Sequence, residues 1–281
     1  ALFVDGHLVP NTELGHLEID GHNAESRAAN SAREVPAIRE KVAARALLAA
    51  AESLGVPREA DLNNEGAPGV GAVPTNVARG IRVSTARGYL AGGPPPGLTV
   101  RGDVRVLRVR VEAGRAVGVD TDTGFVPAGR VLLAAGAIGT AHLLLLSGIG
   151  PGRDLARHGV DVAADLPVGL AISDHPQVVV TWPAARMSPV VGSWLGAAVH
   201  ATSPGSRWAG NVELLQSLLP MASLTAGSTD PGELTLIVSD MTPTARGTLR
   251  LDSADPGTDP RIALGYLRNE ADRSALRHGV R

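Results

Sequence analysis

The segment Val131–Pro151 combines residue types that could bind a phosphate or a dinucleotide. Val131–Ala135 has the apolar composition of a buried strand and runs into Gly136, and Ala137–Ser147 then has the pattern of a helix that two further glycines end. A glycine at such a turn lets a ligand approach the main chain, because it has no Cβ, and the helix N-terminus supplies N–H groups and partial positive charge. A plain strand–turn–helix of an α/β core is the simpler interpretation of the same residues.

Three other side chains suggest chemistry, and each also has a structural interpretation. As a base, His175 would need a partner to orient it, but the neighbouring Asp174 points elsewhere in an extended chain because adjacent side chains alternate. We therefore expect a structural role for His175, and a core or interface role for His142 inside the leucine-rich helix. Ser147 lies in Ser-Gly-Ile-Gly, which lacks the G-x-S-x-G elbow of a hydrolase.

Metal and thiol chemistry find little support in the sequence. His7, His16 and His22 lie among acidic residues, but their spacing does not match a helical two-histidine site, so we expect a solvated loop and no metal. The chain has no cysteine, which excludes disulfides, thiolate zinc sites and cysteine nucleophiles. Lys41 is the only lysine, which argues against a Schiff-base or P-loop lysine.

The composition is that of a folded chain with many turns. The 281 residues are 44% apolar, and the 34 glycines and 20 prolines exceed the usual combined share of about 12%. A net charge of −2 predicts no nucleic-acid partner. The N-terminus lacks the features of a signal peptide, and Val131–Pro151 contains four glycines and a histidine, so we expect no transmembrane segment. These features favour a cytoplasmic protein.

Local patterns predict several elements before residue 176. Glu34–Leu54 has the apolar stripe of an amphipathic helix, and Asp61–Asn76 has the composition of a turn-rich loop. Further predicted elements are strands at Leu98–Val100, Val104–Val111 and Arg115–Asp120, a short helix at Asp154–His158 and a strand at Val160–Ala163.

After residue 176, strands do not alternate regularly with helices, which predicts an antiparallel sheet. The predicted elements are strands at Gln177–Trp182, Leu234–Ser239 and Gly247–Leu251 and a helix over Asn269–Arg277, whereas Met187–Leu219 is poorly patterned.

Several motifs occur in the order that is typical of one enzyme family. They are Asp61–Asn63 with Gly69–Gly71, then Gly80-Ile-Arg82 with Ser84-Thr85 and Tyr89-Leu90, the strands around Val106 and Val119, Leu166–Gly169 with Asp174-His-Pro176, Pro243–Leu251, Asp255–Pro260, and Asp272 with Leu276. Together with Val131–Pro151, this ordered set resembles the glucose–methanol–choline (GMC) oxidoreductases, which use FAD to oxidise alcohols. Leu170–Ser173 resembles the subgroup associated with the mycofactocin system.

The resemblance implies an α/β (mixed α+β) fold, with the central part of a Rossmann-like FAD-binding domain at 1–176 and part of an antiparallel-sheet substrate domain at 177–281. It implies a small-molecule alcohol as substrate, oxidised by hydride transfer to the flavin, and leaves the electron acceptor unspecified. Val106 would lie beside the adenine through its backbone, and Ala135 and Gly136 would let the dinucleotide pass. It assigns no catalytic residue to this chain.

The chain also departs from the family pattern. It contains neither the family's initial G-x-G-x-x-G nor the histidine with asparagine or histidine that ends the family's catalytic region, so it resembles a segment truncated at both ends. Ala245 replaces the serine of the family's Ser-Arg-Gly pattern. Two alternatives stay open: a non-catalytic fragment or degenerate paralogue that packs with a partner, and a lyase of the hydroxynitrile-lyase type.

Overall fold

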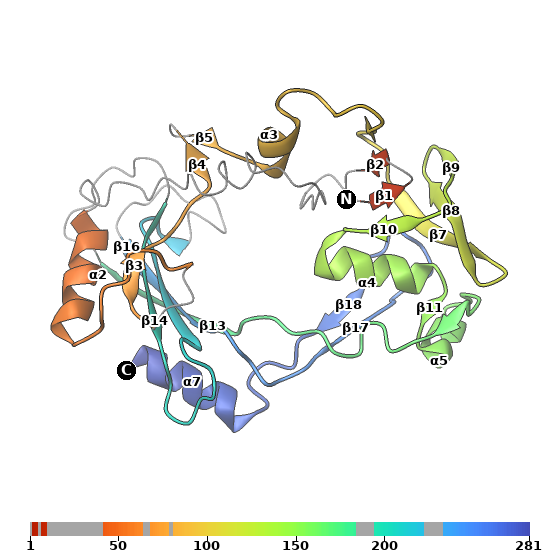
Figure 1. The fold of residues 1–281 in the computed structure, drawn as a ribbon. Coiled ribbons are helices and arrows are strands. Elements are labelled where there is room, and N and C mark those ends of the chain that lie inside the picture. The colour runs from red at the N-terminus through yellow and green to blue at the C-terminus, as the bar shows by residue number, and fades with distance from the viewer. Residues whose placement is uncertain are drawn as a thin grey trace. The chain divides into compact units, whose positions relative to one another are not determined.

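The computed structural model describes residues 2–4, 7–9, 42–63, 68–78, 81–183, 194–221 and 233–281. The chain divides into two compact units, each assembled from segments that are far apart in the sequence (Figure 1). Unit 1 contains Ala1–Asn23, Ser84–Ser173 and Arg246–Gly265, and unit 2 contains Ala24–Val83, Asp174–Ala245 and Tyr266–Arg281.

Unit 1 is built from short sheets around one apolar helix. Its elements are β1 (Leu2–Val4), β2 (His7–Val9), α3 (Thr85–Leu90), β6 (Thr99–Val100), β7 (Val106–Glu112), β8 (Arg115–Thr121), β9 (Gly124–Pro127), β10 (Val131–Leu133), α4 (Gly136–Leu146), β11 (Ile149–Gly150), α5 (Gly152–Arg157), β12 (Ala164–Asp165), β17 (Thr248–Arg250) and β18 (Arg261–Ala263). The strand orders are β10-β1-β2-β6, β7-β8-β9, β11-β12 and β17-β18. The predicted strand and helix of Val131–Ser147 are therefore confirmed as β10 and α4.

The β7–β8–β9 sheet is an antiparallel meander, and its first two strands confirm the strands predicted at Val104–Val111 and Arg115–Asp120. Ala113 and Gly114, the two residues between β7 and β8, both have positive φ (48° and 76°). Two positive φ values in a two-residue loop are typical of the turn that joins twisted antiparallel strands tightly. The sheet encloses an apolar group around Val109 and Val119, which Val131 and Leu133 of β10 also contact.

One predicted strand of unit 1 was wrong. We expected a strand over Val160–Ala163, but β12 covers Ala164–Asp165. The Ala163 N–H donates to the carbonyl oxygen of Gly148 at 2.8 Å, so these residues pack against the end of α4 instead of forming a ladder. Parallel pairing with β11 begins only at Ala164.

Unit 2 is a five-stranded antiparallel sheet with helices on one face. Its elements are α2 (Val42–Ser53), β3 (Val70–Ala72), β4 (Val77–Ala78), β5 (Ile81–Arg82), β13 (Gln177–Pro183), β14 (Leu195–Ala201), β15 (Val212–Ser217), β16 (Glu233–Asp240) and α7 (Glu270–Val280). The strand order is β13-β16-β15-β14-β3, and β4 pairs with β5. Both α2 and α7 contact the side of the sheet that carries Leu214, because this residue packs in both apolar groups. The predicted antiparallel sheet and C-terminal helix are confirmed; residues 34–41 of the predicted first helix lie outside the described residues.

Strand β3 falls in the segment that we predicted to be a loop, so that prediction was wrong for Val70–Ala72. A Cβ at Gly69 would lie 2.6 Å from the Pro57 carbonyl oxygen, and one at Gly71 would lie 2.6 Å from that of Glu59. The two glycines thus let β3 lie directly against another stretch of main chain. The two glycines at this spacing therefore allow close packing of main chain on main chain.

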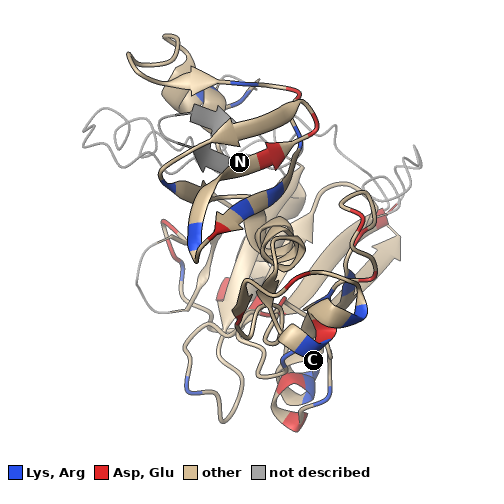
Figure 2. Cartoon of the chain, turned by 90° about the vertical axis from the view of Figure 1, so that its right-hand side faces the viewer, with Lys and Arg blue, Asp and Glu red and all other residues tan. Residues whose placement is uncertain are grey.

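Charged residues of both signs are interspersed along the described strands and helices in the view of Figure 2. Among the described residues, no helix is long and apolar enough to cross a membrane.

Candidate cofactor site

The strand-to-helix turn at the start of α4 is open. Ala135 is the N-cap residue and makes no side-chain capping hydrogen bond. Gly136 follows with a φ of +77°, it is exposed, and a Cβ built on it would meet no other part of the described chain within 4 Å. In an uncapped first turn, backbone N–H groups can donate hydrogen bonds to a ligand. The space beside Gly136 leaves room for that ligand.

Thr140 holds this turn from inside the helix. Its hydroxyl oxygen accepts a hydrogen bond from the Ala135 N–H at 3.2 Å. The bond ties the N-cap residue back to the second turn of α4, much as a capping box does from the third helical residue. We did not assign a role to Thr140 from the sequence. A hydroxyl residue in the second turn of a helix whose N-cap residue has no polar side chain could have indicated a hydrogen bond to the N-cap N–H.

Val106 is the first residue of β7 and is half-buried. It pairs with Thr121 of β8, and the register shifts between Val106 and Arg108. Its side chain packs in the same apolar group as Leu133, two residues before Ala135. Val106, Ala135 and Gly136 thus belong to elements that pack together within unit 1; their contacts to a cofactor stay a prediction.

The other end of α4 is closed. Gly148 has a φ of +78°, and a Cβ there would overlap the carbonyl oxygen of Asp161. A Cβ on Gly150 would overlap the side chain of Leu145. The glycines of Ser-Gly-Ile-Gly therefore allow close packing at the end of the helix, and Ser147 serves as C-cap residue, which agrees with the absence of a hydrolase elbow.

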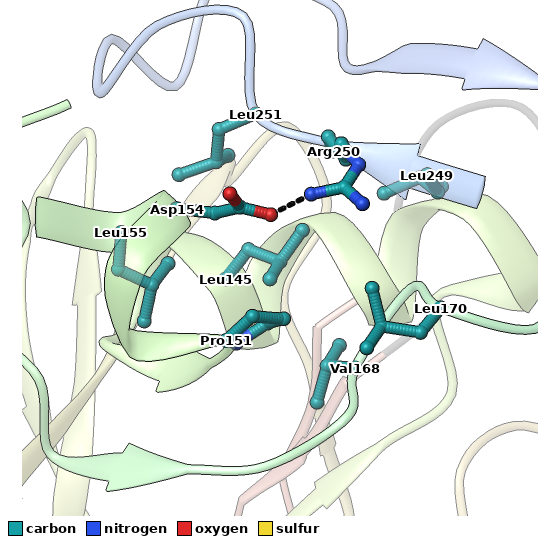
Figure 3. Close-up of a pocket in the computed structure, with 9 residues that line it drawn as sticks. All are labelled: Leu145, Pro151, Asp154, Leu155, Val168, Leu170, Leu249, Arg250 and Leu251. Atoms are coloured by element: carbon teal, nitrogen blue, oxygen red, sulfur yellow. Dashed lines mark hydrogen bonds and ion pairs between the residues drawn. The ribbon is translucent and has the colours of Figure 1, made fainter. Parts of the chain in front are cut away.

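An apolar pocket beside this end of α4 is too small for a cofactor. It is lined by side chains from α4, α5, the segment after β12 and β17, namely Leu145, Pro151, Asp154, Leu155, Val168, Leu170, Leu249, Arg250 and Leu251 (Figure 3). The enclosed volume of about 10 Å³ barely suits one water molecule. Asp154 forms an ion pair with Arg250 across it, which fixes α5 to β17. This region is part of the core.

Unit 2 contains two buried carboxylates of different character. Asp272 accepts hydrogen bonds from the Thr244 N–H, the Thr244 hydroxyl and the Ala245 N–H at 2.6 to 3.0 Å. Asp240 accepts from the Thr242 N–H at 3.1 Å, and burial raises its pKa, to which the nearby charge of Asp272 adds. These contacts fix the segment between β16 and β17, including Ala245 at the position of the family's serine.

His175 lies two residues before β13 and is exposed in this chain. Its N–H donates to the Asp174 carboxylate at 2.8 Å, and the Asp174 carboxylate also accepts from the Tyr266 hydroxyl. Burial, the Asp174 charge and this bond raise the pKa of Tyr266. Asp174 therefore accepts hydrogen bonds from the main chain of His175 and from the Tyr266 phenol. The structural role that we expect for the His175 side chain stays a prediction.

Among the described residues, no cluster of three or more histidine or acidic side chains could hold a metal ion. His16 and His22 lie outside the described residues, and of His7 only the backbone is described.

Comparisons with known proteins connect these features to one family. Two family models of the GMC oxidoreductases match residues 26–177 and 243–281. The chain is 38% identical over 249 residues to an uncharacterized GMC-type oxidoreductase from the thcA 5′ region of Rhodococcus erythropolis, covering 83% of this chain and 47% of the relative. It is 30% identical over 272 residues to the oxygen-dependent choline dehydrogenase of Photobacterium profundum, covering 84% and 47%.

A comparison with solved structures leads to the same family as the sequence comparisons. Pyridoxine 4-oxidase from Mesorbium loti superimposes with a TM-score of 0.76 at 26% identity, over 87% of this chain and 50% of that protein. The chain spans about half the length of the relatives that it matches. The predicted mixed α/β fold of a FAD enzyme is confirmed, and FAD is the cofactor that the family carries. The chain belongs to the GMC oxidoreductase family.

Proposed function

We propose that this chain is part of a FAD-dependent oxidoreductase that acts on the CH–OH group of a small alcohol. The observation that carries the proposal is the turn between β10 and α4, where an open glycine precedes an uncapped helix N-terminus within a segment that matches the family. When bound, FAD supplies the redox chemistry by accepting a hydride from the alcohol carbon.

The residues of this turn fit a dinucleotide. Among the described residues, nothing would contact a Cβ on Gly136, and the first turn of α4 carries no side-chain cap, so both room and hydrogen-bond donors are available for a phosphate. Ala135 and Gly136 would line the passage of the dinucleotide. The main chain of Val106, at the shifted register of β7, would lie beside the adenine.

We also propose that residues 1–176 belong to the FAD-binding domain and residues 177–281 to the substrate domain. The family models over 26–177 and 243–281 support this division. Within the first range, α2 and β3 pack on the sheet of unit 2. The FAD-binding part would therefore contribute a helix and an edge strand to the substrate sheet. A cytoplasmic location stays a prediction.

The test uses the complete open reading frame that contains these residues. The purified protein should carry flavin, seen by its visible absorbance, and an alcohol from a panel that includes choline and pyridoxine should bleach it under anaerobic conditions. Bound flavin that no alcohol reduces would contradict the oxidoreductase proposal and favour the lyase alternative. A protein that neither carries nor takes up FAD would favour the non-catalytic alternative.

A further inference from the structure

Ser147 makes a contact that helix capping alone does not require. Its hydroxyl donates to the Leu143 carbonyl oxygen at 2.5 Å and accepts from the N–H of Val109 at 2.8 Å. The side chain is buried, with 9% of the residue exposed. Ser147 therefore joins the end of α4 to the middle of β7, across 38 residues of sequence.

Strand β7 needs such a contact because it is an edge strand. In the order β7-β8-β9, β8 is its one partner among the described strands. An edge strand presents N–H groups without a partner in the ladder, and a buried N–H without an acceptor is costly. Ser147 supplies the acceptor for Val109, which is itself buried in the core of the sheet.

The contact lies close to the start of β7. Val106 is three residues before Val109, and the register shift between Val106 and Arg108 separates it from the regular ladder. Pairing with Thr121, and the hydrogen bond from the Arg105 N–H to the Asp122 carboxylate at 3.1 Å, hold Val106 to β8, but neither contact sets its distance from α4. Among the described residues, the hydrogen bond from Val109 to Ser147 joins β7 to the end of α4, and α4 begins at Gly136.

We propose that Ser147 is a positioning residue for the adenine half of FAD. It holds β7 against α4, so that the main chain of Val106 and the turn at Gly136 keep the separation that one dinucleotide spans. This inference rests on the proposed function, because it takes FAD as the ligand of both elements. The hydroxyl acts through the strand and does not touch the cofactor.

The experiment compares Ser147→Ala with Ser217→Ala in the complete protein. Ser217 is a matched control because it is fully buried, donates to the Leu219 carbonyl oxygen at 2.6 Å and accepts from the Leu219 N–H at 3.2 Å in unit 2. Apoprotein is titrated with FAD by flavin fluorescence and with ADP by competition, and the Tm of each apoprotein is measured. Ser147→Cys is made in parallel, because it keeps a γ atom that can form only weak hydrogen bonds, and it decides the question if Ser147→Ala does not fold.

We expect both alanine variants to lose a similar amount of Tm. Only the Ser147 variants should bind FAD and ADP more weakly, by about tenfold for Ser147→Ala. An FAD Kd within twofold of the wild type in a Ser147 variant with lowered Tm would overturn this inference and leave the proposed function intact. A wild-type protein that binds no FAD would overturn the proposed function and this inference together.

Discussion

The two ends of α4 carry glycines with nearly the same backbone conformation in opposite surroundings. Gly136 at the start has a φ of +77°, and Gly148 after the end has a φ of +78°. A side chain on Gly136 would point into open space, whereas one on Gly148 would overlap the main chain at Asp161. The protein thus fills the space beside one glycine and leaves the space beside the other clear.

This difference distinguishes a glycine that allows close packing of the chain from one that leaves room for a ligand. Positive φ makes glycine favourable at both positions, so the backbone conformation does not tell the two roles apart. The surroundings do, because a protein that leaves a glycine uncovered next to an uncapped helix N-terminus gains no packing from it. We therefore expect the first glycine to affect FAD binding and the second to affect stability.

Replacing Gly148 should have the largest effect. Gly148→Ala adds a Cβ that overlaps the Asp161 carbonyl oxygen, and we expect a loss of roughly 3 kcal/mol or more of unfolding free energy from strain and overpacking. Gly159→Ala is the control, because Gly159 has a φ of +70° with nothing near its Cβ, and it should lose only about 1–2 kcal/mol. Equal losses in urea unfolding would contradict the closed packing at this end.

Replacing Gly136 should damage cofactor binding and spare the fold. Gly136→Val places a branched side chain where the dinucleotide would pass, so we expect FAD affinity to fall by up to about a hundredfold. Gly159→Val carries comparable backbone strain at a distance from this turn and should keep its FAD. Flavin content after purification measures the outcome, and unchanged flavin in Gly136→Val would make Gly136 a structural turn residue only.

The sequence predicts that a dinucleotide passes at Gly136, and the structure adds that the space beside this glycine is open among the described residues, whereas contact with a cofactor stays a prediction. The apolar run before Gly136 and the leucines after it predict a strand and a helix from residue types alone, and the structure has both. The open space at Gly136 depends on what the rest of the chain leaves uncovered. In the same way, the bond from Val109 to Ser147 joins residues far apart in the sequence, and only the packing of β7 on α4 brings them together.

The secondary structure likewise could be predicted from the sequence only in part. The β-branched and apolar residues of Gln177–Trp182 and Leu234–Ser239 predict strands, and they form β13 and β16. Strand β3 could not be predicted from its own residues, because glycines and prolines around it are typical of loops, and it becomes a strand through pairing with β14 and with the main chain around Arg58. At β12, the predicted position was wrong because contacts with Gly148 displace the pairing toward Ala164.

A smaller change at the open end tests whether the position of the helix N-terminus matters. Thr140→Val keeps the shape of the side chain and removes the hydroxyl that accepts from the Ala135 N–H. A lost hydrogen bond of about 1 kcal/mol should weaken FAD binding about fivefold and lower the Tm by a few degrees. Thr202→Val in unit 2 is the control, because its hydroxyl accepts from the Gly210 N–H at 3.0 Å in a similar way. If both variants bind FAD equally well, the start of α4 does not contact the cofactor.

The smallest effect is expected between the two ends, at His142. Its Nε2 atom is buried and has no hydrogen-bond partner among the described residues. Burial lowers the pKa of His142 and the nearby Arg105 charge also lowers it, while Asp259 acts in the opposite direction. Because the folded-state pKa lies below the unfolded-state value of about 6.5, the unfolded chain takes up the proton first as the pH falls.

The contribution of His142 to folding is therefore complete well above pH 6.5 and decreases as the pH falls below that value. His142→Gln cannot take up this proton, so its Tm should fall less than that of the wild type between pH 7.5 and pH 5.5, by a few degrees at most. His158→Gln, at the C-cap of α5, is the control for histidine removal in general. An equal fall of Tm in wild type and His142→Gln would mean that the middle of α4 is open to water, which would weaken the contrast between its open start and its closed end.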